Sequence, residues 1–391
     1  MQRFTYKRFL ETVFLIAAVI GMAGCSSNQS MLVSNDSGDA YTNRFFSKYS
    51  NAFFYLQPDG MVKWLDYDSM QEAPLCNKPN CRHITDDCIE TQINQNTPVF
   101  SDSNAYFFED EAPEFVEGEN GKTELRLGTT LWDFDFSKWK KTKLTQLQDV
   151  SVSTNCYGML LHENTLYFIT NALSRSYDEN GMLVGYGGSG GEMNLYSFNL
   201  STNEMTNHCR LYDVERLKEY YPLAPISGES YMKGLFDNKI YFNVGFVVKT
   251  ADQERYQFYV TYYDLSDGTY HGTPEDYEQI DFAAVSYASD DYLVICRDGA
   301  AWVYKKGSDQ PIMLEDTCFN QDASVAVYDD VLFYYDKAFD LNSGNVRQFD
   351  FMREKEVVAK YGNSFIIADC GMQSGFEKIP AEKLLNETEK P

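Results

Sequence analysis

Histidine is scarce in this chain, with four among 391 residues. His162 and His271 fall in expected turns and His208 stands next to Cys209, and none of them has a serine nearby in a nucleophile context. The sequence also has no Gly-x-x-x-x-Gly-Lys-Ser/Thr loop for phosphates and no His-Glu-x-x-His pair for a catalytic zinc. These absences argue against a serine hydrolase, a P-loop nucleotidase and a zincin protease.

Basic residues are few as well, because 33 Lys and Arg stand against 58 Asp and Glu, which gives a net charge of −25. A surface of this sign repels nucleic acid and anionic lipid headgroups, and it keeps an exposed protein soluble. We therefore expect no nucleic-acid partner. The charge by itself indicates no substrate.

Long apolar runs are absent, and the longest covers residues 13–22. This run is too short to cross a hydrocarbon core of about 30 Å, which needs about 20 residues. Arg3, Lys7 and Arg8 precede it, and small residues follow it. A basic start, a short apolar run and small residues before a cleavage site predict a secretory signal peptide over residues 1–24.

Cys25 follows directly on Ala23-Gly24, and this short motif resembles the lipobox of bacterial lipoproteins, with Met22 where Leu is more usual. The resemblance implies lipid on Cys25 and anchoring at the outer face of the cell membrane. Residues 25–39 then form the lipidated cysteine and a flexible tether. An ordinary cleaved signal, or an uncleaved anchor with a chance cysteine, stays the alternative.

Long amphipathic helical patterns are missing too, whereas aromatic residues make up 15% of the chain. Aromatic side chains pack well on half-buried pleated sheets, which favours strands. One pattern recurs along the chain, an Asn or Asp suited to a tight turn and then an aromatic strand, as in Asn164-Thr-Leu-Tyr-Phe168. Its occurrences are residues 51–55, 104–108, 164–168, 238–242, 291–295, 330–334 and 363–367. An alternating strand that ends in a turn follows at residues 61–67, 131–136, 194–200 and 260–265.

The repeats predict an all-β fold, a β-propeller built of four-stranded antiparallel sheets, because repetition around an axis protects sheet edges. Seven blades are preferred and six are the alternative, while a pair of β-sandwiches is the competing fold. We expect one propeller domain over residues 40–385 and a C-terminal tail over residues 386–391. The seventh repeat lacks an outer strand, which residues 40–48 are expected to supply. Long hairpin loops are expected at residues 111–122, 173–192 and 243–257.

The most distinctive segment is an insert at residues 74–92, which holds Cys76, Cys81, His83 and Cys88. Three cysteines and a histidine within 13 residues have the ligand types of a tetrahedral Cys₃His zinc site. The spacing Cys-x₄-Cys-x-His-x₄-Cys is not that of a zinc finger, ribbon or knuckle. An oxidising cell exterior favours a disulfide instead, with the third cysteine either paired elsewhere or left as a free thiol. Both interpretations stay open, so the cofactor expected is none or one structural zinc.

The same insert, placed after a first blade and behind a lipobox, resembles uncharacterised bacterial surface lipoproteins of Gram-positive bacteria. Their propellers are similar in architecture to TolB-like and YWTD-type propellers. The resemblance spans most of the chain, and the cysteine insert is its specific part. It implies the fold and the location, but it implies no activity and no catalytic residues.

Three functions are compatible with these features. The preferred one is a non-catalytic propeller at the membrane that binds a protein, peptide or glycan ligand, because rigid folds with varied loops suit recognition. The alternatives are a glycan-active hydrolase with carboxylates at the propeller axis and a metal- or redox-sensing lipoprotein that uses the cysteine insert. Residues 185–190 match Gly-x-Gly-x-x-Gly, but a strand follows rather than a helix, so a flexible hairpin loop is expected there.

Overall fold

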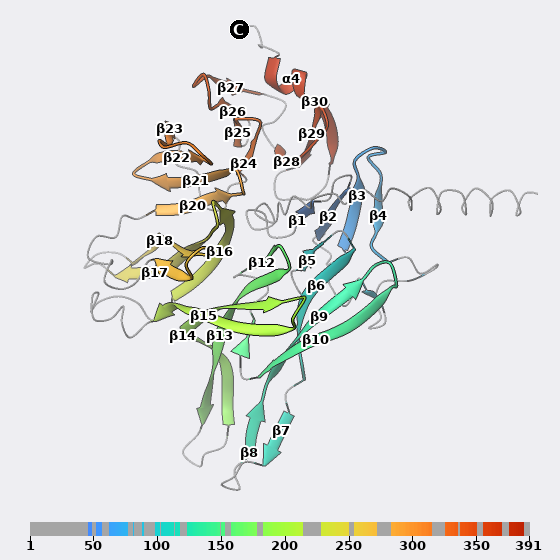
Figure 1. The fold of residues 1–391 in the computed structure, drawn as a ribbon, viewed down its shortest axis with the longest axis vertical. Helices are drawn as coiled ribbons and strands as arrows, with labels where there is room; N and C mark the ends of the chain where they lie inside the picture. The colour runs from blue at the N-terminus through green and yellow to red at the C-terminus, as the bar shows by residue number, and fades with distance from the viewer. Residues whose placement is uncertain are drawn as a thin grey trace, which may run out of the picture. The chain divides into compact units, whose positions relative to one another are not determined.

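The computed structural model describes the strands and the turns between them (Figure 1). The described residues are 46–48, 52–56, 62–76, 81, 88–89, 98–101, 103–112, 114–117, 123–148, 150–152, 158–177, 183–213, 228–249, 254–271, 283–314, 325–334, 337–349, 355–369 and 375–386. The chain divides into two compact units, Met1–Ser34 and Asn35–Pro391. The first unit, with the expected signal peptide and Cys25, lies outside the described residues, as does His83. All described residues belong to the second unit.

Seven of the eight antiparallel sheets among the described residues form a β-propeller with seven blades, and the eighth has two strands. Blade 1 consists of β1 (Phe46–Lys48), β2 (Ala52–Leu56), β3 (Val62–Asp66) and β4 (Glu72–Pro74). Blade 2 consists of β5 (Val99–Phe100), β6 (Asn104–Asp110), β9 (Gly128–Asp135) and β10 (Lys140–Gln148). Between β6 and β9 stands an extra hairpin of β7 (Glu114–Glu117) and β8 (Thr123–Arg126).

Blade 3 carries its first strand in two pieces, which pair with different parts of the same neighbour. Its strands are β11 (Val150–Ser151), β12 (Met159–His162), β13 (Thr165–Tyr177), β14 (Leu183–Asn199) and β15 (Glu204–Asp213). Blade 4 consists of β16 (Gly228–Phe236), β17 (Lys239–Lys249), β18 (Glu254–Asp264) and β19 (Thr269–His271).

Each of the last three blades spans fewer residues than blades 2, 3 and 4. Blade 5 consists of β20 (Ala283–Ala288), β21 (Tyr292–Arg297), β22 (Ala300–Lys305) and β23 (Ile312–Leu314). Blade 6 consists of β24 (Val325–Tyr328), β25 (Val331–Tyr334), β26 (Lys337–Asp340) and β27 (Val346–Gln348). Blade 7 has three described strands and a helix, namely β28 (Lys355–Tyr361), β29 (Ser364–Asp369), β30 (Glu377–Pro380) and α4 (Ala381–Asn386). No helix among the described residues is long and apolar enough to cross a bilayer.

A repeated turn explains the sequence pattern. In five blades an Asp or Asn ends the third strand and its side-chain oxygen accepts backbone N–H groups of the following turn. The next residue donates its N–H to the carbonyl of the residue just before the second strand, as Leu200 does to Asn164 O at 2.8 Å and Leu265 to Asn238 O at 2.9 Å. The two recurring motifs are therefore the two sides of one contact, which ties both hairpins of a blade at the same end.

Seven apolar clusters make the core. Six of them join neighbouring blades, in the sequence 2–3, 3–4, 4–5, 5–6, 6–7 and 7–1. The seventh packs the segment that follows β4 of blade 1 against blade 2. The 7–1 cluster closes the ring, so the preference for seven blades is confirmed, and the six-blade alternative and the paired sandwiches are wrong. Aromatic side chains fill these spaces, and Phe108 of blade 2 meets Phe168 of blade 3 edge-on at 4.7 Å between ring centroids.

The ring closes through side chains. Tyr67 and Val358 are buried in the 7–1 cluster, Tyr361 OH donates to Asp68 Oδ1 at 2.9 Å, and Lys378 Nζ donates to Tyr67 O at 3.0 Å. The expectation that residues 40–48 complete the seventh blade is wrong for their described part. β1 pairs with β2 of its own blade. Pairing across the short connection between them closes a much smaller loop than pairing with a strand of blade 7, at the other end of the chain.

The expected long loops are mostly strands. β13 and β14 pair from Asn199 out to Tyr177, and β17 and β18 pair without interruption out to Lys249. The Gly-x-Gly-x-x-Gly segment at 185–190 lies within β14, so the expected flexible loop there is wrong. The overlapping residues 187–191 also match the Gly-x-Ser-x-Gly pattern of a nucleophile elbow. That motif needs a strand-to-helix turn, whereas these residues lie within one continuous strand.

Candidate functional site

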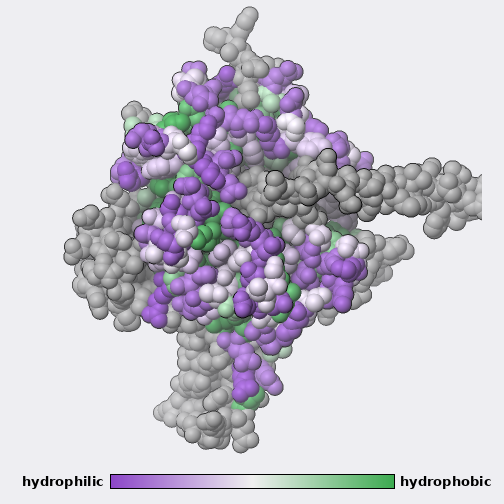
Figure 2. Space-filling model, in the orientation of Figure 1, coloured by the Kyte–Doolittle hydropathy of each residue, from purple (hydrophilic) through white to green (hydrophobic). Residues whose placement is uncertain are grey.

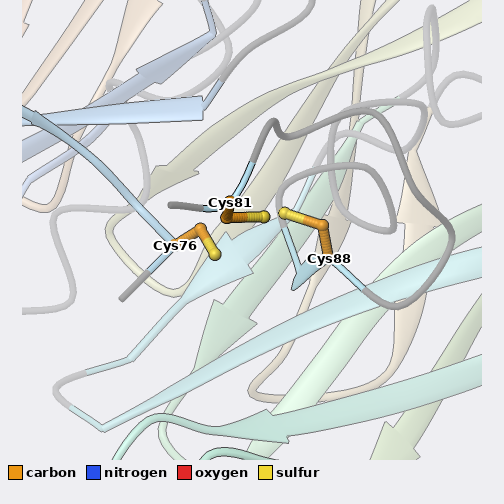
Figure 3. Close-up of side chains that lie close together, drawn as sticks. All are labelled: Cys76, Cys81 and Cys88. Carbon is orange, nitrogen blue, oxygen red and sulfur yellow. The ribbon is translucent and has the colours of Figure 1, made fainter. Parts of the chain in front are cut away.

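Three cysteines of the insert converge in the structure. Cys76 follows β4, Cys88 stands before Ile89 on the way to β5, and Cys81 lies between them. Their three sulfur atoms all lie within 4.8 Å of one another. Figure 3 shows Cys81 and Cys88 pointing toward each other, with Cys76 beside them. The predicted cysteine cluster is thus assembled, while its fourth predicted member, His83, lies outside the described residues.

The cysteines are set into the core where the segment that follows β4 packs against blade 2. Cys88 is 0% exposed and Cys76 is 9% exposed, and both pack with Phe107 of β6 and Phe134 of β9, while Cys81 is half-buried against the same group. Phe134 also meets Trp139 edge-on, with ring centroids 5.3 Å apart. An aromatic shell of this kind keeps water away from the buried sulfur atoms.

Two chemistries fit three sulfur atoms at this distance. Around a tetrahedral zinc with Zn–S bonds of 2.3 Å, sulfur atoms stand about 3.8 Å apart. A disulfide has an S–S bond of about 2.05 Å and uses two of the three sulfurs. Both separations lie below the limit of 4.8 Å within which the three sulfur atoms stand.

A second polar group lies between blades 3 and 4, and the sequence did not reveal it. His208 hydrogen-bonds through Nε2 to Ser197 Oγ at 2.7 Å and through Nδ1 to Tyr263 OH at 2.9 Å. The register of β14 and β15 shifts here, because Leu195 pairs with Cys209 and Tyr196 pairs with Asn207. His208 is therefore the extra residue of a β-bulge, which turns its side chain toward the next blade.

The order serine, histidine, tyrosine has the contacts of a nucleophile, its base and an orienting group. Ser197 and Tyr263 are, however, only 6% exposed, so a substrate has no access to the serine oxygen. Burial lowers the pKa of His208, which keeps the ring neutral near pH 7. The group serves as a contact between blades. The only sequence signal for the contact between Ser197 and His208 is their separation of 11 residues, which is compatible with the two strands of one hairpin.

A glycan hydrolase would need a carboxyl group with a raised pKa to act as the acid. Among the described residues, Asp133 of β9 has its pKa raised by burial, although a hydrogen bond from Asn104 Nδ2 at 2.7 Å opposes the shift. The neighbouring Asp135 has its pKa lowered, chiefly by Lys138 and by the Ser137 hydroxyl of the turn. Asp264 and Asp340 occupy the same turn position in other blades with the same direction of pKa shift, so Asp135 is part of the blade repeat.

No protein-family model and no curated protein matches the chain. Among solved structures it is similar to an acylaminoacyl peptidase in complex with Z-Gly-Gly-Phe-chloromethyl ketone, with 10% identity, a TM-score of 0.41 and coverage of 88% of this chain. The chain spans about half of that peptidase, 52% of its length.

Two further similar structures are propeller-sized. One is the β-propeller domain of the Trilobed protease from Pyrococcus furiosus, described as having an open velcro topology, with 9% identity, a TM-score of 0.39 and coverage of 86% of this chain and 94% of that one. The other is an ulvan lyase bound to a sulfated disaccharide unit, with 7% identity, a TM-score of 0.39 and coverage of 86% and 91%. Similarities of this size say nothing of activity.

Proposed function

We propose that this chain is a lipoprotein, anchored through Cys25 at the outer face of the cell membrane, whose propeller binds a protein, peptide or glycan ligand without catalysing a reaction. The anchor rests on the lipobox in the sequence. The binding role rests on how the propeller is built on one side of blades 2, 3 and 4.

The observation that carries the proposal is a group of three extended hairpins on consecutive blades. Each stands between the second and third strands of its blade, and they are β7–β8, β13–β14 and β17–β18. The equivalent connection in blade 5 is a two-residue turn, Asp298-Gly299. Equivalent turns lie on the same face of a propeller, and β8 contacts β14, so the first two hairpins stand side by side (Figure 1). Extended hairpins on a rigid ring are a usual basis for recognition.

The outer part of β14 offers one edge to a ligand. β15 pairs with β14 from Glu192 onward, and no described strand pairs with that edge over residues 183–191. Unpaired backbone N–H and C=O groups on a strand edge accept an extended peptide as an added strand. Figure 2 shows that the described residues on the side in view are mostly hydrophilic.

The anchor is tested with Cys25→Ala in the full chain. We expect metabolic labelling with a palmitate analogue to mark the wild type and not the variant, and the variant to move from the membrane fraction to the soluble fraction. An unlabelled wild type that nevertheless stays in the membrane would reject lipidation.

The binding role is tested by shortening hairpins in register. Leu173 pairs with Gly188 and Phe246 pairs with Gln257, so residues 174–187 or 247–256 can be replaced by Asn-Gly, which suits a two-residue turn. Probes are purified cell-wall glycan fragments on an array, and photo-crosslinking to neighbouring membrane proteins in intact cells. We expect each shortened protein to melt like the wild type and to lose binding. Lys306→Ala, an exposed change at the opposite end of blade 5, serves as control.

Two results would contradict the proposal. Unchanged binding by both shortened proteins would move the ligand site away from the hairpins. Recovery of a captured glycan in cleaved form, by mass spectrometry, would favour the hydrolase over a non-catalytic protein, and Asp133→Asn would then be the first variant to assay.

A further inference from the structure

The sulfur atoms of Cys76, Cys81 and Cys88 lie within 4.8 Å of one another. From this convergence we propose that they bind one Zn²⁺ ion as thiolates, and that the ion clamps blade 1 to blade 2. The inference stands independently of the ligand proposed for the hairpins.

The geometry favours a shared ion. Three sulfur atoms from points spread over 13 residues come together, although Cys76, Cys81 and Cys88 lie in none of the described strands and follow one another between β4 and β5. A sulfur separation of about 3.8 Å is what a tetrahedral zinc thiolate requires, and a limit of 4.8 Å lies close to it. A disulfide would draw in two sulfurs and give no reason for the third to stand at the same point.

The surroundings favour zinc over a hard cation. Thiolate is a soft ligand that selects zinc or copper(I), whereas calcium and magnesium need several oxygen ligands. Leu75, Ile89, Ala105 and Phe107 pack in the same cluster as Cys76 and Cys88, and among the described residues the group of possible metal ligands holds the three cysteines and no carboxylate. Cys81 is half-buried, so the side of the cluster at Cys81 is the side from which a fourth ligand or a water molecule can reach the ion.

The position of the site explains what the ion would do. The segment between β4 and β5 is the covalent link from blade 1 to blade 2, and Cys76, Cys88, Phe107 and Phe134 share one core cluster. Blade 1 is built of short strands, of 3, 5, 5 and 3 residues. Binding three ligands of that link to one ion restricts the unfolded chain and adds the metal-binding free energy to folding.

The experiment uses the full chain, extracted in detergent without chelator and with thiols trapped by alkylation at lysis. Metal is measured by mass spectrometry of the elements, and thiols are counted before and after chelation. We expect one zinc per chain, with three thiols that react only after chelation. Replacing zinc by Co²⁺ should give thiolate-to-cobalt charge-transfer absorption, a readout that needs no variant and so survives poor folding of the mutants.

Variants separate a built site from stray metal. Cys76→Ser, Cys81→Ser and Cys88→Ser should each lose the zinc and the charge-transfer band, whereas Cys209→Ser, between blades 3 and 4, should keep both. Chelation should speed hydrogen exchange in β2 and β3 and leave β21 and β22 unchanged. A peptide map with a disulfide between two of the three cysteines in the trapped protein would overturn the proposal, and so would equal metal in all variants.

Discussion

The side chain of Asn243 in β17 hydrogen-bonds both backbone groups of Val285 in β20. Its Nδ2 donates to Val285 O at 3.0 Å, and its Oδ1 accepts Val285 N–H at 2.7 Å. Asn243 is 2% exposed and Val285 is 0% exposed. One amide thus takes the place of a neighbouring strand and joins blade 4 to blade 5 by two hydrogen bonds.

Replacing this residue by Ala should destabilise the protein strongly. Asn243→Ala leaves the N–H and the C=O of Val285 buried without these partners, at a cost of about 1–3 kcal/mol for each group. Asn243→Asp should be at least as harmful, because a carboxylate cannot donate to the carbonyl. Urea unfolding measures the loss. Asn342→Ala, an exposed asparagine in blade 6, is the control and should change the free energy of unfolding by less than about 1 kcal/mol.

Asp330 should separate charge from backbone conformation at the junction of blades 5 and 6. Its carboxylate accepts Tyr292 OH at 2.7 Å and Lys305 Nζ at 2.6 Å, and its φ is +62°. Asn tolerates this φ and can still accept from Tyr292, so Asp330→Asn should cost under about 1 kcal/mol. Asp330→Ala loses both contacts and adds strain of roughly 1–2 kcal/mol. Equal losses for the two variants in urea unfolding would contradict this account.

The same carboxylate predicts a dependence on acid. The ammonium of Lys305, and then Tyr292, hold the pKa of Asp330 below the unfolded value of 3.8. A lowered folded pKa means that the unfolded chain binds the proton first, so the stabilisation is present above about pH 4 and is lost as the pH falls. The difference in unfolding free energy between wild type and Asp330→Asn should therefore shrink below pH 4, as measured by urea unfolding at each pH.

His208 predicts a dependence at milder pH. Burial lowers its folded pKa below the unfolded value of 6.5. Its neutral ring is the folded form, so stability is complete above about pH 6.5 and falls as the pH drops, because the unfolded chain takes up the proton more readily. His208→Gln should remove this part of the pH profile between pH 5 and 7. A wild type and a variant with parallel profiles in that range would disprove it.

The junction between blades 7 and 1 should open more readily than the others. Ile366 and Ile169 are both 0% exposed, in the 7–1 and 3–4 clusters. Either change to Ala should cost about 2–5 kcal/mol. Only Ile366→Ala should also speed hydrogen exchange in β2 and β29 below the global unfolding limit, because blades 7 and 1 are not consecutive in the chain. Matching exchange patterns in the two variants would show that the junction is no weaker.

The blades could be predicted from the sequence because their determinants are local. Asn164 and Asn238 lie in the turns just before β13 and β17, and turn geometry needs only a few neighbouring residues. The cysteine cluster could be predicted for the same reason, since its members lie within 13 residues.

Contacts between residues far apart in the chain could not be predicted from the sequence. Glycine at 185–190 indicated a loop, but pairing with β13 overrides that preference. The meeting of Ser197, His208 and Tyr263 depends on a bulge in β15 and on a neighbouring blade, and no residue type marks a bulge in advance. β1 pairs with β2 of blade 1, where the two strands are separated by a short connection, and the sequence pattern alone did not distinguish this pairing from one with blade 7.

A ring closed by side chains has a mechanical consequence. Any pull on the N-terminal segment reaches the propeller through β1, which is held by three residue pairs, Phe46 with Tyr55, Ser47 with Phe54 and Lys48 with Phe53. Such a short ladder peels away under less force than the long hairpins of blades 3 and 4 would bear. The strand would thus act as a breakable link, which yields while the other six blades keep their packing.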